Sequence, residues 1–307
     1  MRRFLIVATT CIQLAQAEEY VLPPEDIGVV GQTETEQAAH EDTLSDIARR
    51  HGLGFDQIVK ANPNVDPWLP GTGTIITLPK RHVLPDAPRE GIVINVPEMR
   101  LFYYPKPKAG ELPKLLTYPV SIGRLDWKTP LGLTTVAAKV TNPTWTPPET
   151  IRREHAAQGE ILPAVVPAGP DNPLGQYALR LGVRGYLIHG TDKAWGIGMR
   201  VTHGCMRLYP ENIETLFKEV SVGTPVRLVS QPFKVGWLSG ILYLQVFQPL
   251  EEEEQTLVEQ NTHIRLLAKA VEGRPRGSYQ IDGEAIRRTV ANKMGLPIPV
   301  GREILAD

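Results

Sequence analysis

Short apolar runs, separated by proline and glycine, are the feature that most limits how this chain can fold. They recur between residues 92 and 229, with turn-forming residues between them. Short runs bounded in this way are typical of β-strands. With 28 prolines and 27 glycines, and with few long helical periodicities, the sequence predicts a mainly β fold.

The first 17 residues have the pattern of a cleaved secretory signal peptide. A basic start precedes an uncharged apolar stretch from Phe4 to Leu14, and Ala15-Gln16-Ala17 fits the small-x-small motif that signal peptidase requires. No later run approaches the roughly 20 apolar residues that span a bilayer. We therefore predict an exported protein whose mature chain begins at Glu18.

Export leaves a single thiol. Cys11 lies inside the leader, so Cys205 is the only cysteine that the mature chain keeps. An exported chain with one cysteine has no internal disulfide, and its stability must come from an ordinary core. The net charge is -1 and the sequence has no basic stripe, which argues against a nucleic-acid-binding function.

A small helical unit is predicted near the N-terminus of the mature chain. A polar, extended lead covers residues 18–36, and residues 37–80 then show a strand-helix-helix-strand pattern. Thr43 is a good N-cap for the first helix, and Gly52 is placed to end it. Asn62-Pro63 ends the second helix.

A mainly β unit is predicted over residues 90–230. It opens with a hairpin formed by residues 92–104 and contains a long proline-rich loop from Asn142 to Gly175. A helix begins near Pro210. Residues 231–307 form a less regular, mixed extension, in which an acidic run at residues 251–254 begins an amphipathic helix.

The run Thr202-His203-Gly204-Cys205 carries the chemistry. Acyl transfer through sulfur needs a thiolate, a base to form it and hydrogen-bond donors for the oxyanion. Both His189, at the end of a predicted strand, and His203 are candidate bases, and the residues alone do not choose between them. Cys205 as an inert core residue and a zinc site of His189, His203 and Cys205 are the alternatives; the spacing matches no usual zinc motif, and no cofactor is expected.

The N-terminal unit resembles a LysM module, the small βααβ domain that binds glycans containing N-acetylglucosamine. The resemblance rests on four segments and departs from the family at the first strand, where residues 34–40 lack the usual apolar alternation. The four segments are Glu41 to Ala48, Ile58 to Pro63, Leu69 to Thr72, and Ile75 to Pro79.

The site region resembles the signature of L,D-transpeptidases of the YkuD family. His189-Gly190-Thr191 precedes Thr202-His203-Gly204-Cys205-Met206-Arg207, and Ile122-Gly123 precedes Thr129-Pro130-x-Gly132 in the expected order. With the leader, the LysM-like unit and the segments at 145–147 and 163–173, the chain is similar to periplasmic enzymes that attach Braun's lipoprotein to peptidoglycan. The resemblance implies a β-sandwich catalytic domain.

The same resemblance implies a role for each site residue. Cys205 would attack the meso-diaminopimelate carbonyl of a peptidoglycan tetrapeptide stem and expel D-alanine. His189 would act as general base and acid, oriented by a nearby backbone carbonyl such as that of Gly190. Gly204 and Cys205 would lend N–H groups to the oxyanion. The remaining pocket positions are Gly190, Thr202, His203 and Arg207, and Arg207 would either meet a stem carboxylate or support the loop.

The acyl acceptor stays open at the level of sequence. The favoured acceptor is the C-terminal lysine of the lipoprotein; another diaminopimelate would give a 3-3 cross-link, and water would make the enzyme a carboxypeptidase. A wall-binding scaffold without catalysis is the alternative from a different class. Glycan strands are the expected partner of the LysM-like unit, and carbapenems are expected to acylate Cys205.

Overall fold

The computed structural model describes residues 17–124, 127–251, 253, 261–275 and 277–304. The predicted signal peptide lies outside these residues except for Ala17, and so do residues 252 and 254 of the acidic run. Within the described ranges, no helix has the length and apolar character needed to cross a membrane.

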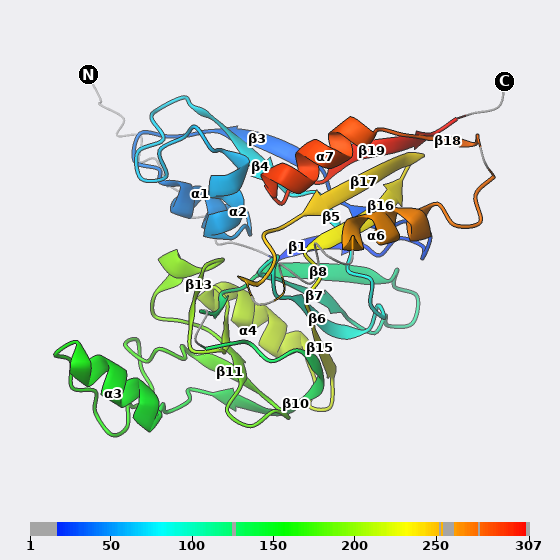
Figure 1. Ribbon diagram of the computed structural model, residues 1–307. Coiled ribbons are helices and arrows are strands. Elements are labelled where there is room, and N and C mark those ends of the chain that lie inside the picture. Colours follow the sequence, from blue (N-terminus) through cyan, green and yellow to red (C-terminus); the bar gives the residue numbers. More distant parts are fainter. Residues whose placement is uncertain (1–16, 125–126, 252, 254–260, 276, 305–307) are drawn as a thin grey trace, which may run out of the picture.

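A nine-stranded curled sheet, which includes most strands of the unit predicted at residues 90–230, lies in the lower part of Figure 1 and is called the main sheet. Its order is β1-β8-β7-β6-β15-β10-β11-β12-β14. The bounds are β1 (Glu18–Val21), β6 (Gly91–Asn95), β7 (Arg100–Tyr104), β8 (Lys114–Pro119), β10 (Gly132–Thr141), β11 (Tyr177–Leu181), β12 (Leu187–His189), β14 (Met206–Arg207) and β15 (Pro225–Val229). The predicted hairpin is β6 and β7, which turn through Met99 at a φ of 54°.

Helix α4 (Pro210–Glu219) closes the core of this sheet. Its apolar residues Ile213 and Leu216 are buried against Ile92, Ile94 and other strand residues. Proline at its first turn costs no hydrogen bond, because that N–H has no partner within the helix. A short parallel pair, β9 (Ile122–Gly123) and β13 (Arg200–Thr202), lies beside the main sheet. The mainly β fold is confirmed.

The N-terminal unit has the predicted βααβ arrangement. Strands β3 (Thr33–Gln37) and β4 (Ile75–Pro79) pair antiparallel, and helices α1 (Leu44–Arg50) and α2 (Phe55–Ala61) pack on them. Thr43 caps α1 in a reciprocal capping box with Asp46. The side chains of the first strand alternate between exposed and half-buried, and none is fully buried. This strand therefore needs no apolar alternation, in agreement with its sequence.

Two regions are more ordered than the sequence predicted. The loop from Asn142 to Gly175 contains a helix, α3 (Glu149–Ala157), and the C-terminal extension contains a four-stranded sheet of order β16-β17-β19-β18. Its strands are β16 (Phe233–Leu238), β17 (Ile241–Val246), β18 (Tyr279–Ile281) and β19 (Ile298–Glu303), with helices α6 (Thr262–Ala270) and α7 (Gly283–Asn292) packed on them.

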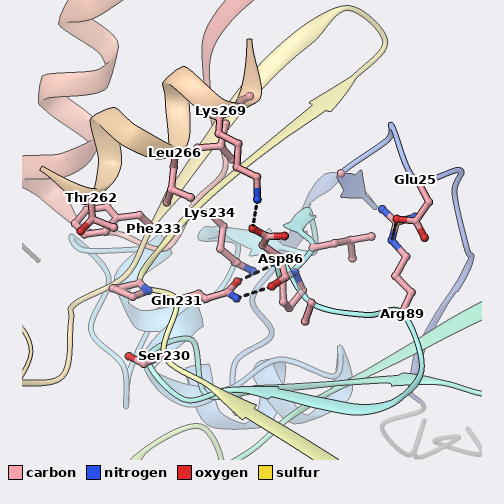
Figure 2. A pocket seen from close by; sticks show the side chains of 17 residues that line it. Glu25, Asp86, Arg89, Ser230, Gln231, Phe233, Lys234, Thr262, Leu266 and Lys269 are labelled. Carbon is pink, nitrogen blue, oxygen red and sulfur yellow. Dashed lines mark hydrogen bonds and ion pairs between the residues drawn. The ribbon is translucent and has the colours of Figure 1, made fainter. Parts of the chain in front are cut away.

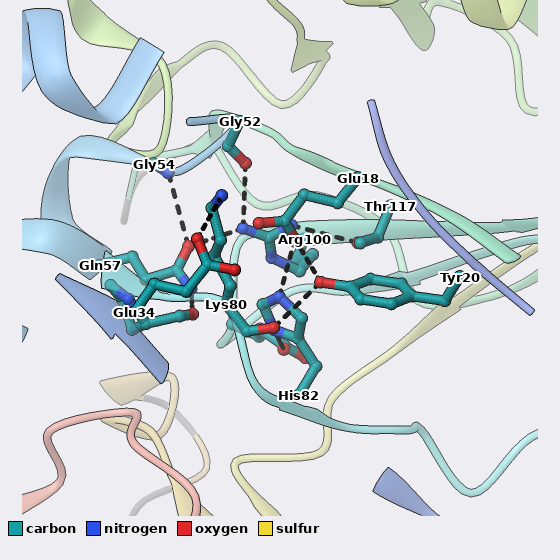
Figure 3. A network of polar contacts seen from close by, with 12 residues as sticks. Glu18, Tyr20, Glu34, Gly52, Gly54, Gln57, Lys80, His82, Arg100 and Thr117 are labelled. Atoms are coloured by element: carbon teal, nitrogen blue, oxygen red, sulfur yellow. Dashed lines mark hydrogen bonds and ion pairs between the residues drawn. The ribbon is translucent and has the colours of Figure 1, made fainter. Parts of the chain in front are cut away.

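A buried polar network joins these units (Figure 3). Arg100, on β7, is 1% exposed and donates to Oε1 of Gln57 in α2 at 2.7 Å and to Oγ1 of Thr117 at 3.2 Å. It also forms an ion pair with Glu18 of β1 at 3.4 Å. Glu18 in turn meets His82, in β5 (His82–Val83), which pairs with β2 (Val29–Val30). The first residues of the described chain therefore hold the helical unit against the main sheet.

Candidate active site

Two neighbouring parallel strands bring His189 and Cys205 together. In the pairing of β12 with β14, Ile188 lies opposite Met206 and His189 lies opposite Arg207. Cys205 directly precedes β14. Because side chains alternate between faces along a strand, Cys205 and Arg207 point to the same face as His189. The structure thus places the imidazole, the thiol and the guanidinium on one side of this sheet edge.

His189 is held as a neutral imidazole. Its side chain is buried, and Nδ1 lies 2.7 Å from the carbonyl oxygen of Gly190, the contact expected from the sequence. A carbonyl only accepts, so Nδ1 carries the proton and Nε2 is left as an acceptor. Burial and, to a smaller extent, the positive charge of Arg207 together lower the pKa of His189 to about 3. The ring is therefore neutral at neutral pH, with Nε2 unprotonated.

Cys205 rests as a thiol rather than as a thiolate. Its Sγ lies 3.6 Å from the carbonyl oxygen of Gly185, and burial raises the pKa of the thiol above its usual value. The charge of Arg207 opposes this rise without cancelling it. With both groups neutral, attack by sulfur requires transfer of the thiol proton to a base as the new bond forms.

Hydrogen bonds within residues 202–205, the nucleophile loop, fix its shape. Oγ1 of Thr202 donates to the carbonyl of Cys205 at 2.6 Å and accepts the N–H of Gly204 at 3.1 Å. The Gly204 N–H, expected at an oxyanion, is thus engaged inside the loop in this structure. Gly204 has a φ of +99°, and a Cβ there would lie 2.9 Å from Cε1 of Tyr186, so a side chain would be both strained and crowded.

Thr129 explains the second sequence element. Its Oγ1 accepts the N–H of Gly123 at 3.0 Å and donates to the carbonyl of Gly204 at 3.1 Å. A Cβ on Gly123 would lie 1.9 Å from the carbonyl oxygen of Trp127. The Ile122-Gly123 and Thr129-Pro130 elements therefore pack directly against the nucleophile loop.

His203 is already engaged by two neighbouring side chains. Its Nε2 lies 3.0 Å from Oε2 of Glu154, and its ring meets the edge of Trp127 at a centroid distance of 5.0 Å. The other carboxylate oxygen of Glu154 accepts from Arg124 at 2.6 Å. A ring nitrogen that is hydrogen-bonded to a carboxylate acts as a donor, so Nε2 of His203 is not available to accept a proton. Of the two candidate bases that the sequence left open, His189 is therefore favoured.

Arg207 and Gly190 both lie next to the pair formed by His189 and Cys205. The Nε of Arg207 is buried without a hydrogen-bond partner among the described residues, and burial lowers the pKa of the guanidinium. A side chain at Gly190 would be crowded, because a Cβ would lie 3.1 Å from Cγ2 of Ile213. Behind it, Gly175 at the end of the 142–176 loop packs against Gly190 and Thr191.

The helical N-terminal unit docks on the 190–199 loop, which joins His189 to β13. The N–H groups of Phe55 and Asp56 donate to the carbonyls of Ile197 at 2.9 Å and Gly198 at 3.3 Å. Gly198 has a φ of +83°, and a Cβ there would lie 2.3 Å from the Cα of Gly54. This junction is thus backbone against backbone.

Comparison with known proteins identifies the family of the chain. A family model for the L,D-transpeptidase catalytic domain, YkuD, matches residues 89–228, and a LysM domain model matches residues 40–79. The probable L,D-transpeptidase YcfS of Escherichia coli is 40% identical, over 97% of this chain and 93% of the relative. The chain belongs to the L,D-transpeptidase family.

Further relatives of this L,D-transpeptidase agree. The probable L,D-transpeptidase YbiS of Escherichia coli is 41% identical over 92% of each chain, and ErfK/SrfK of Salmonella typhimurium is 38% identical over 92% of this chain and 91% of its own. Among solved structures, the catalytic domain of an Enterococcus faecium L,D-transpeptidase covers 47% of this chain and 100% of its own, at 23% identity and a TM-score of 0.33.

No group of three or more histidine, cysteine, aspartate or glutamate side chains is arranged to hold a metal ion in the ranges that the structure describes. The L,D-transpeptidase also has a cleft of about 390 Å³ between α6 and the connector at residues 84–89 (Figure 2). Lys269 and Asp86 form an ion pair of 2.7 Å across it. Neither His189 nor Cys205 lines this cleft.

Glu154 is the site residue of the L,D-transpeptidase that sequence reasoning missed. It lies on α3, in a segment predicted as loop, because only Ile151 of that helix is buried and no apolar face repeats along it. A signal was present: Pro147-Pro148 followed by Glu149 is a suitable helix start, and Glu149 and Arg153 are spaced for an i,i+4 ion pair.

Proposed function

We propose that this L,D-transpeptidase acts on peptidoglycan tetrapeptide stems in the periplasm, with Cys205 as nucleophile and His189 as general base and acid. The observation that carries the proposal is the register of β12 and β14, in which a neutral imidazole and a thiol share one face of a sheet edge. Such a pair is suited to nucleophilic acyl transfer.

The first half-reaction forms a thioester. Sγ of Cys205 attacks the meso-diaminopimelate carbonyl while Nε2 of His189 takes the thiol proton, and the carbonyl electrons move to oxygen. When the oxyanion collapses, the carbon–nitrogen bond to D-alanine breaks, and His189 returns the proton to the leaving amine. The second half-reaction runs in reverse with an acceptor amine, and Cys205 regains its proton.

Two site residues can stabilise negative charge in this cycle, one on the oxyanion and one on the substrate. The N–H of Cys205 is the oxyanion donor that we favour, because the Gly204 N–H is bonded to Thr202 in the resting structure. Arg207, with its buried and unpartnered Nε, would hold a stem carboxylate near the reacting carbonyl. Thr202, Gly190 and Thr129 fix the backbone around them.

We favour the C-terminal lysine of Braun's lipoprotein as the acceptor, on the resemblance of the segments at 145–147 and 163–173. A diaminopimelate amine would give a 3-3 cross-link, and water would give the carboxypeptidase reaction. The LysM domain at residues 40–79 would bind the glycan strands that carry the stems.

The test uses the mature enzyme from Glu18 and a soluble disaccharide tetrapeptide. We expect D-alanine release and an adduct on Cys205 by intact mass, both abolished in Cys205→Ala. A peptide ending in the lipoprotein's C-terminal lysine should then compete for the acyl group. Failure of the wild-type enzyme to release D-alanine would overturn the proposal, and a retained cell-wall phenotype in a Cys205→Ala strain would favour the scaffold alternative.

A further inference from the structure

Glu154 links two parts of the chain that flank the nucleophile. It belongs to α3, in the 142–176 loop, and both of its carboxylate oxygens are used: Oε1 accepts from Arg124 at 2.6 Å and Oε2 meets Nε2 of His203 at 3.0 Å. Arg124 follows the Ile122-Gly123 element, and His203 lies two residues before Cys205. One side chain therefore connects α3 with both strands of the β9–β13 pair.

Helix α3 has little other attachment. Ile151 is its only fully buried residue, and Arg152 and Arg153 are exposed. In Figure 1 the helix lies at the outer edge of the part that contains the main sheet, away from the LysM domain and the C-terminal sheet. A segment with few buried apolar contacts opens readily, and a bidentate charged contact then has a large share in holding it.

The base of the same loop is held separately. The amide nitrogen of buried Asn172 donates to the carbonyls of Pro143 and Pro167, each at 2.9 Å, and its Oδ1 accepts from the N–H of Leu174. These contacts close the loop near its two ends, at residues 143 and 172–174. They do not reach α3, so the position of α3 against the nucleophile depends on Glu154.

His203 transmits this attachment to the nucleophile. Its ring is fixed between Glu154 and the edge of Trp127, and its backbone leads directly into Gly204 and Cys205. Gly204 has a left-handed conformation, and the hydroxyls of Thr202 and Thr129 hold its N–H and its carbonyl. A shift of the His203 ring would therefore loosen α3 from this loop, while the hydroxyls of Thr202 and Thr129 still hold the backbone of Gly204 and Cys205.

We propose that Glu154 is a positioning residue: it clamps α3 onto the nucleophile loop through His203, next to the thiol that would react with the stem peptide. This rests on the proposed function, because the position of α3 matters to turnover only if Cys205 receives the stem peptide. Glu154 does not touch the reacting atoms. Its removal should weaken substrate binding more than the chemical step, since Cys205 and His189 keep their own hydrogen bonds.

The test compares Glu154→Gln and Glu154→Ala with Glu149→Gln in the full mature chain. Glu149 lies on the same helix, is exposed, and pairs only with Arg153 among the ion pairs of the described residues, so it is a matched control. We expect Glu154→Ala to raise KM for the disaccharide tetrapeptide about tenfold with a smaller fall in kcat, Glu154→Gln to lie between, and Glu149→Gln to match wild type.

Amide hydrogen exchange gives a readout that does not need turnover. Exchange at residues 149–157 and 203–205 should speed up in Glu154→Ala while exchange in the core strands stays unchanged. In a double-mutant cycle on KM, His203→Gln should raise KM by little more once Glu154 has been replaced.

The outcomes separate the two proposals. Unchanged KM in Glu154→Ala, or equal losses in Glu149→Gln, would overturn the clamp even if stability fell. A wild-type enzyme without D-alanine release would instead overturn the proposed function, and unchanged exchange at 149–157 in Glu154→Ala would then overturn the clamp as well.

Discussion

The nucleophile is supported from two sides by attachments of opposite kinds. On one side, the LysM domain meets the 190–199 loop through backbone hydrogen bonds and a contact between Gly54 and Gly198. On the other, α3 meets the nucleophile loop through the carboxylate of Glu154. A backbone junction has no room for added atoms and is insensitive to salt, whereas the contacts of a half-buried carboxylate can be weakened by salt, pH or one substitution. We therefore expect the LysM side to be rigid and the α3 side to be adjustable.

The largest effect should come from Arg100→Met, on the LysM side. The change leaves Glu18 buried with fewer partners and removes the hydrogen bond to Gln57, which should cost about 3–5 kcal/mol of unfolding free energy. Urea denaturation measures it. The control is Arg49→Met, whose ion pair with Glu211 lies at the rim of the same junction and should cost about 1 kcal/mol or less. Equal costs for the two would contradict a rigid, buried junction.

Gly198→Ala should come next. An alanine must adopt a φ of +83° and push against the Cα of Gly54, for about 2–4 kcal/mol in total. D-alanine release should fall together with stability, because the 190–199 loop begins directly after His189. Gly196→Ala is the control, since a Cβ there meets nothing within 4 Å. If thermal melts gave the two variants the same Tm, the close docking of the LysM domain would be refuted.

Asn172→Ala tests the α3 side and should have a smaller, local effect. It removes donors to two carbonyls and an acceptor for the Leu174 N–H, worth about 1–2 kcal/mol within the loop. We expect higher KM and faster proteolysis between residues 142 and 176, with little change in the global melt. The neighbouring exposed Asp171→Ala should behave as wild type. A large global loss of stability would mean that this loop belongs to the rigid part.

The smallest effect should appear on mild acidification, and its sign should differ between the two sides. The pKa of Glu154 is lowered by hydrogen bonds from Arg124 and His203, so its contribution to stability is complete above its usual pKa and is lost as the pH falls through the lowered value. Burial raises the pKa of Asp56, at the LysM junction, so the folded state gains stability there as the pH falls through the raised value. Amide exchange at about pH 6 and about pH 4, corrected for intrinsic rates, should show α3 loosening while residues 195–198 do not. Loosening of both segments together would contradict the distinction.

The sequence predicts an element most reliably where the local residue pattern and the fold favour the same structure. The β6–β7 hairpin, the capped helix at Thr43 and the helix from Pro210 have strong local signals, and each is present. His189 and Cys205 were found because a strand end and a glycine turn carry recognisable residues, and the structure adds that a parallel register brings them to one face.

The missed parts depend on contacts distant in sequence. Helix α3 has one buried residue and no apolar face, so its place is set by Arg124 and His203 rather than by its own pattern. The strands β18 and β19 are separated by α7 and pair only in three dimensions. The lead at residues 18–36 was predicted as extended, but nothing local shows that Glu18–Val21 pairs with residues 114–117.

That pairing makes the LysM domain an insertion rather than an N-terminal appendage. Strand β1 comes before the domain in sequence and β6 after it, yet both belong to the main sheet. Truncation from the N-terminus would therefore remove an edge strand and Glu18 together with the LysM domain. A variant that lacks only the LysM domain needs an internal excision of residues 33–79, which removes β3 together with its partner β4, keeps β1 in place and joins the cut ends.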